Sequence, residues 1–101
     1  MPDLRRSTRH HVAIAAKLTV NGTTFDATIL NLSIGGARAT SIGKHAMGQR
    51  VDVRFKVPSV EHSVEIGAIV RWANDEGVGL QFDGLRARDV WALNEFFKQL
   101  P

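Results

Sequence analysis

One stretch near the start of the chain has side chains suited to binding an anion. Arg5, Arg6 and Arg9 stand within five residues of one another. Each offers a planar, permanently charged set of donors that fits phosphate oxygens, or the O6 and N7 atoms of guanine, in pairs. This stretch is therefore a candidate phosphate or guanine site.

A second stretch, Asn31-Leu32-Ser33-Ile34-Gly35-Gly36, has complementary chemistry. Asn31 and Ser33 have short polar side chains that can hydrogen-bond a base edge or a phosphate. The two glycines permit positive φ angles and a close approach of the backbone to a ligand. The same residue types are also the usual ones in turns, so this stretch alone does not distinguish a binding site from a connector.

The net charge of +3 lies near the N-terminus. Residues 1–17 carry four basic side chains and one acidic one, whereas the rest of the chain holds nine of each. A neutral body with a basic arm favours a local anion site over a broad polyanion-binding face. A solvated basic tail is the alternative interpretation.

Length and composition set further limits. The chain has 101 residues, 44% of them apolar and none of them cysteine, which predicts one globular domain over residues 1–101 without disulfides or thiolate metal sites. The longest apolar run is five residues, Val12 to Ala16, too short for a transmembrane helix or a signal peptide. We therefore expect a cytoplasmic protein.

Most of the chain alternates between apolar and polar residues with the period of a β-strand. The clearest example is Val51 to Val57, which Pro58 ends, and Asn21-Gly22 is suited to a two-residue hairpin turn. Six strands are expected, at residues 12–20, 25–29, 37–40, 51–57, 64–72 and 78–82.

The period changes to that of a helix over residues 85–100. We expect a flexible basic arm over residues 1–10, a barrel over 11–83 and a C-terminal helix over 85–100. The predicted fold class is all-β: a small six-stranded antiparallel β-barrel with one C-terminal α-helix. The expected packing residues of the helix are Val90, Trp91, Leu93, Phe96, Phe97 and Leu100.

The order of these features resembles the PilZ domain, a family of bacterial receptors for cyclic di-GMP. The family signature is an RxxxR stretch followed, about 20–30 residues later, by a [D/N]xSxxG stretch. Arg5-xxx-Arg9 matches the first and Asn31-x-Ser33-xx-Gly36 the second. The resemblance extends to the last hairpin, RWANDEGVGLQF, and so covers essentially the whole chain.

The resemblance implies a role for each matching position. Arg5 and Arg9 grip the guanine edges and phosphates of cyclic di-GMP, and Arg6 between them is a candidate for a further phosphate contact. Asn31 and Ser33 hydrogen-bond the ligand from the barrel surface, and Gly36 lets the backbone turn beneath it.

Two residues outside the signature have two interpretations each. Trp72 could stack on a guanine, or it could belong to the core, since it shares the strand parity of Val70 and Ala68. Arg38 either faces the ligand or is simply solvated. We include Trp72, but not Arg38, in the predicted binding site.

The predicted function is a cyclic di-GMP receptor or adaptor that presents a changed surface to an effector protein in trans, as a monomer or weak homodimer. No cofactor, metal, nucleic acid or membrane insertion is expected. An enzyme is disfavoured because Ser33 lacks a nucleophile elbow, and the four histidines lack metal-ligand spacing. A ligand-free PilZ-like adaptor and a small nucleic-acid-binding barrel are the alternatives.

Overall fold

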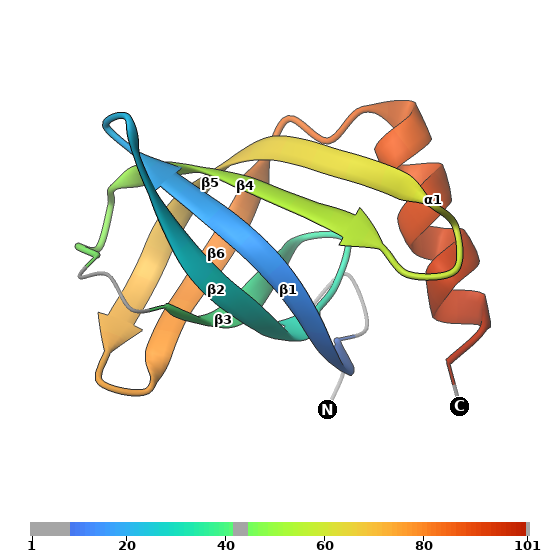
Figure 1. Ribbon diagram of the computed structural model, residues 1–101, viewed down its shortest axis with the longest axis horizontal. Coiled ribbons are helices and arrows are strands. Elements are labelled where there is room, and N and C mark those ends of the chain that lie inside the picture. Colours follow the sequence, from blue (N-terminus) through green and yellow to red (C-terminus); the bar gives the residue numbers. More distant parts are fainter. Residues whose placement is uncertain (1–8, 42–44, 101) are drawn as a thin grey trace, which may run out of the picture.

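The computed structural model describes residues 9–41 and 45–100, which form a closed barrel with one helix at its end (Figure 1). All neighbouring strands are antiparallel, and their order around the barrel is β1-β2-β3-β6-β5-β4. The expected fold class is therefore confirmed. The elements are β1 (His10–Val20), β2 (Thr23–Leu32), β3 (Gly36–Ser41), β4 (Arg50–Val57), β5 (His62–Asn74), β6 (Gly77–Asp83) and α1 (Ala87–Lys98).

The barrel interior is filled by the apolar side of each alternating strand. β4 shows the pattern most clearly, with each of its four apolar residues buried and each polar residue exposed. Because the strand period is two, one register places the whole apolar set inside. The fully buried core includes Leu18, Ile29, Leu32, Val53, Val57, Val64 and Val70.

The regular pairing of three strands is interrupted. Register shifts interrupt the pairing between His11 and Ile14 in β1, between Ile29 and Asn31 in β2, and between Val70 and Trp72 in β5. Bulges of this kind bend a strand and change where its side chains point. They decide which residues of the candidate site face outward.

Helix α1 begins two residues later, and ends two residues earlier, than the 85–100 expected. Gly84 has a φ of 100° and Arg86 is extended, so the chain turns before the first helical residue. The buried face is also rotated from the predicted stripe: Asp89, Ala92, Leu93 and Phe96 are buried. Trp91, expected to pack, is 58% exposed.

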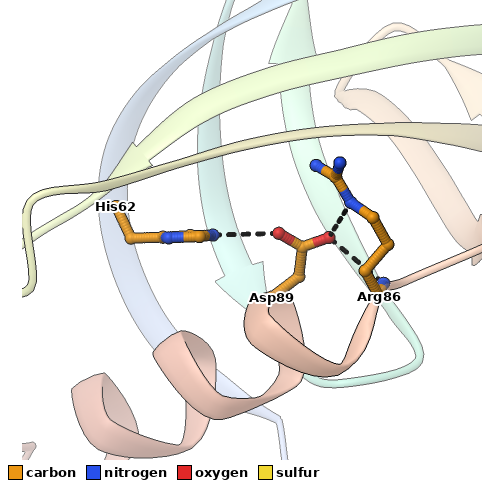
Figure 2. Close-up of polar contacts among 3 residues, drawn as sticks. All are labelled: His62, Arg86 and Asp89. Carbon is orange, nitrogen blue, oxygen red and sulfur yellow. Dashed lines mark hydrogen bonds and ion pairs between the residues drawn. The ribbon is translucent and has the colours of Figure 1, made fainter.

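Asp89 is the charged residue that the pattern placed outside and the structure buries completely. Figure 2 shows its contacts with His62 and Arg86. Its Oδ1 lies 2.9 Å from Nε2 of His62, and its Oδ2 accepts the backbone N–H of Arg86 at 3.1 Å and the Arg86 Nε at 3.3 Å. Since an ionised carboxylate only accepts, the histidine nitrogen is the donor. The carboxylate thus caps α1 and joins it to β5.

Burial by itself opposes ionisation of Asp89, but the hydrogen bonds from His62 and Arg86 outweigh it. The pKa of Asp89 is therefore lowered from its ordinary value. A second contact supports the same docking: the ring of His10 on β1 stacks on Phe97 with centroids 4.2 Å apart. Within the described residues, no helix has the length and apolar character needed to cross a membrane.

Replacing the carboxylate by an amide tests this anchor. We expect Asp89→Asn to lower the free energy of unfolding by about 1–3 kcal/mol at pH 7, because an amide nitrogen then faces buried donors. Asp83→Asn is the matched control, since the Arg50–Asp83 ion pair is exposed and should contribute about 0–1 kcal/mol. Urea denaturation measures both, and equal effects would contradict the anchoring role.

The same carboxylate gives a pH dependence of known sign. Because its pKa is lower in the folded chain, its stabilisation is fully present above the ordinary carboxyl value of 3.8 and is lost as the pH falls through the lowered folded value. We expect the stability difference between wild type and Asp89→Asn to shrink over that acid range. Denaturation at a series of pH values measures it, and a constant difference would refute the linkage.

Candidate functional site

The pairing of β1 with β2 brings the end of the arginine stretch to the polar stretch. His10 pairs with Leu32 and His11 with Asn31, so Arg9, the residue before β1, lies at the level where Ser33 follows β2. Arg9 is exposed. The other predicted arginines, Arg5 and Arg6, lie outside the described residues, as does the rest of the predicted arm over residues 1–8.

Ser33 organises the turn between β2 and β3. It is only 5% exposed, and its hydroxyl accepts the backbone N–H groups of Gly35 and Gly36, each at 3.2 Å. The hydroxyl also donates to the carbonyl of Gly36 at 3.3 Å, and the Ser33 backbone N–H donates to the same carbonyl at 2.9 Å. In this structure, therefore, the serine holds the turn in shape.

Gly36 is required by the close approach of two strands. A Cβ atom built there would lie 2.1 Å from the backbone carbonyl oxygen of Leu80 on β6. Its φ is not in the left-handed region, so the positive φ that a glycine permits is not used at this position. The carbonyl of Gly35 accepts the Phe82 N–H at 2.9 Å, which fastens the turn to β6 as well.

Four residues on the outside of the barrel form a cross-strand row, here called the outer row: Asn31, Arg38, Gly79 and Trp72. Asn31 pairs with Arg38, Arg38 with Gly79, and Gly79 with Trp72, on β2, β3, β6 and β5. Paired residues point to the same face of a sheet. Ala39, the next residue along β3, is fully buried, so Arg38 and the rest of the row point to the outside of the barrel.

Arg38 contributes a donor that the barrel does not use. Its side chain is half-buried, and its Nε is enclosed with no hydrogen-bond partner in the described part of the chain. An enclosed donor of this kind is costly unless something accepts from it. The side chain of Arg38 is therefore only partly solvated in this structure.

Trp72 lies on the outer surface, so its strand parity with Val70 is misleading. The bulge between Val70 and Trp72 shifts the register, and the side chain is 37% exposed. Its indole covers Gly79: a Cβ atom at that glycine would lie 2.1 Å from Nε1. A flat aromatic surface therefore lies next to Arg38 in the outer row, where a base could stack.

One serine–histidine contact lies elsewhere, between β3 and the segment after it. Oγ of Ser41 is 3.0 Å from Nε2 of His45, and burial lowers the pKa of this histidine. In a catalytic triad the other ring nitrogen donates to a carboxylate. Nδ1 of His45 has no partner among the described residues. The described residues also hold no cluster of three or more potential metal ligands.

Comparison with known proteins identifies the family to which the chain belongs. A family model for the PilZ domain matches residues 3–99, nearly the whole chain. The chain belongs to the PilZ family. PilZ domains are cyclic di-GMP receptor or adaptor domains and are generally not enzymes.

Two solved structures share the PilZ fold. The Bacillus subtilis inhibitor of motility MotI/DgrA superposes with a TM-score of 0.77 at 16% identity, and the match covers 99% of this chain and 55% of that one. The chain therefore spans about half the length of MotI. The PilZ domain of CeSA from a cellulose-synthesizing bacterium has a TM-score of 0.71 at 14% identity, with 91% and 97% covered. No curated protein sequence matches.

Within the PilZ fold, the structure places Arg38 and Gly79 in one cross-strand row with Asn31 and Trp72, two of the residues predicted from sequence. The sequence contains a hint of the position of Gly79. Val78 and Leu80 on either side of it are buried, so Gly79 lies on the outer face of β6, and it has no side chain to occupy that face. Its partner Trp72 could not be assigned to the outside without the bulge. The structure brings Asn31, Ser33, Gly36 and Arg9 to one end of the β2–β3 pair and places Trp72 two strands further on.

The two glycines of this surface should respond differently to alanine. In Gly79→Ala the new methyl meets the Trp72 indole, which can move, whereas in Gly36→Ala it meets a backbone carbonyl. We expect Gly36→Ala to cost about 1–3 kcal/mol of stability. Gly79→Ala should instead shift tryptophan emission to longer wavelength and increase acrylamide quenching.

Fluorescence in a Trp91→Phe background isolates Trp72, because the chain has two tryptophans. The same background without the glycine substitution is the control. Unchanged emission in Gly79→Ala would show that the indole does not cover this glycine in solution.

Proposed function

We propose that this PilZ domain binds cyclic di-GMP on the outer row, with Arg9 closing the site from the β1 side. The observation that carries the proposal is the enclosed Nε of Arg38, which has no hydrogen-bond partner among the described residues and belongs to the same cross-strand row as Asn31 and Trp72. The row combines a cation, an amide and an aromatic face. These are the groups needed by a ligand with two phosphates and two guanines.

Each side chain of the row has a task in this proposal. Trp72 stacks on one guanine, and the guanidinium of Arg38 binds a phosphate or the O6/N7 edge of a guanine. Asn31, half-buried, hydrogen-bonds a base edge or a phosphate. Arg9 supplies a second guanidinium, and Arg5 and Arg6 contribute further contacts of the same kind.

Ser33 and Gly36 support the site in a different way from that implied by the signature alone. The Ser33 hydroxyl is engaged with the turn, and Gly36 lets β3 approach β6. Both therefore hold Asn31 and Arg38 at their positions on β2 and β3. We propose that they act on ligand binding mainly through this geometry, and that direct contacts come from the outer row and the arginines.

The expected affinity follows from the number of such contacts. A bidentate arginine–guanine pair contributes about 1–3 kcal/mol, and charge-assisted phosphate bonds add to it. After the entropic cost of association, a total near −8 kcal/mol corresponds to a dissociation constant of about 1 μM. Loss of one arginine should then weaken binding about tenfold or more.

Ligand binding would change the surface around Arg9 and the outer row, and an effector protein in trans would recognise the changed surface. The domain would act in the cytoplasm as a monomer or weak homodimer. The structural relatives come from an inhibitor of motility and from a cellulose-synthesizing bacterium, so one domain type occurs in different regulatory settings.

The two alternatives are less well supported by the surface. A ligand-free adaptor has no need of an enclosed guanidinium nitrogen such as that of Arg38, for which residues 9–41 and 45–100 supply no hydrogen-bond partner. A nucleic-acid-binding barrel needs a track of cations for several phosphates, whereas the chain beyond residue 17 is electrically balanced.

Calorimetric titration of cyclic di-GMP tests the proposal. We expect micromolar binding to wild type and at least about tenfold weaker binding to Arg9→Ala and Arg38→Ala, because each loses a guanidinium. Arg88→Ala, an exposed arginine on α1, is the matched control and should bind as wild type does.

Two further ligands complete that experiment. GTP and a short single-stranded oligonucleotide should give no comparable heat. Absence of heat from cyclic di-GMP with folded wild-type protein would overturn the receptor proposal in favour of the adaptor, and binding of the oligonucleotide alone would favour the nucleic-acid alternative.

A further inference from the structure

A second surface feature lies on the outside of β1, β2 and β4 and at the start of β5. A shallow hollow of about 560 Å³ has Ala15, Thr28 and Ser63 among its lining residues, together with the cations Lys17, Arg54 and Lys56. We call this feature the basic hollow. None of its lining residues belongs to the outer row or to the turn of Ser33.

The basic hollow concentrates positive charge on an otherwise balanced barrel. Lys17 forms an ion pair with Asp26, the one acidic residue of the lining. Arg54 and Lys56 are exposed and have no hydrogen bond or ion pair within the described part of the chain. Glu65 pairs with Arg54 in the strand register without forming an ion pair, so it offsets the charge only in part.

The two unpaired cations have the spacing of an extended chain. Arg54 and Lys56 are two residues apart on β4 and point to the same side, so their Cα atoms are roughly 6.6 Å apart. Carboxylates on alternate residues of an extended peptide recur at the same interval. The small side chains of Ala15 and Ser63 beside them leave room for a backbone to approach.

Other occupants fit these observations less well. The polar side chains of the lining are at the surface, whereas small-molecule sites enclose most of their ligand. A nucleic acid or an anionic membrane needs a broader array of cations than two unpaired side chains.

We infer that the basic hollow docks an extended acidic segment of the effector protein, with carboxylates on alternate residues pairing with Arg54 and Lys56. The inference rests on the proposed function in that it names the chemistry of the partner of that receptor. Such exposed charge pairs set the association rate and the salt dependence more than the final affinity.

The test uses a defined probe, the capped peptide Glu-Ala-Glu-Ala-Glu-Ala, with the Lys-Ala repeat as its charge control. Titration into the ¹⁵N-labelled full chain should shift amide signals around Ala15, Arg54 and Lys56 in NMR spectra, in a salt-dependent manner. The Lys-Ala peptide should cause no such shifts.

Variants locate the site. Arg54→Glu with Lys56→Glu should raise the dissociation constant of the acidic peptide at least tenfold. Arg88→Glu with Lys98→Glu on α1 is the matched double charge reversal and should change it less than twofold. Because all four side chains are exposed, both variants should fold, which their spectra and thermal unfolding check.

Failure of the inference is distinguishable from failure of the proposed function, since cyclic di-GMP is titrated into the same variants. Ligand binding with no peptide shifts at the basic hollow, or with equal loss in both double variants, would overturn the inference alone. Peptide binding at the hollow without cyclic di-GMP binding would support the surface and remove the receptor proposal. Binding to vesicles containing phosphatidylglycerol, but not to the peptide, would replace the acidic segment by a lipid surface.

Discussion

The close approach of β3 to β6 is the constraint on which the barrel and its site both depend. β1, β2 and β3 follow one another around the barrel, but β3 then pairs with β6 rather than with β4. At this seam the backbones are so close that a Cβ atom at Gly36 or Gly77 would fall 2.1 or 2.3 Å from a carbonyl oxygen of the facing strand. Since Arg38 and Gly79 lie on the same two strands, the pairing that joins the barrel here also builds the centre of the outer row.

A second constraint fixes the helix. The buried carboxylate of Asp89 accepts three hydrogen bonds, one from His62 and two from Arg86. The observed orientation of α1 brings the carboxylate to these donors. A buried charge without its partners would be strongly destabilising. This requirement, together with Leu93 and Phe96, determines which face of the helix is inside, and Trp91 is left on the outside as a consequence. Apolar periodicity alone cannot anticipate that a carboxylate takes a core position.

Features that depend on many residues at once could be predicted from the sequence, whereas features that depend on one local contact could not. Period-two alternation predicted the strands because burial on one face is a property of many residues at once, as in β4. The orientation of Trp72 depended on a single bulge, which has no signature in the alternation. The resemblance implies that Ser33 contacts the ligand; the structure shows in addition that its hydroxyl is engaged in the turn, because a short polar side chain next to glycines can bond to the local backbone. The alternation of residues also does not show how far Arg38 is buried, whereas the structure shows that its Nε is enclosed.

The two proposed surfaces share a strand, which bears on how one could influence the other. Thr28, in the basic hollow, and Asn31, in the outer row, lie on β2 on either side of its bulge between Ile29 and Asn31. The β1 register shifts at the same level, between His11 and Ile14. Regular ladder pairing is interrupted here, so both strands bend and their local twist increases at this level. A ligand held by Asn31, as proposed, would contact β2 on one side of this bulge, with Thr28 of the basic hollow on the other side and the fully buried Ile29 and Leu32 in the core beneath.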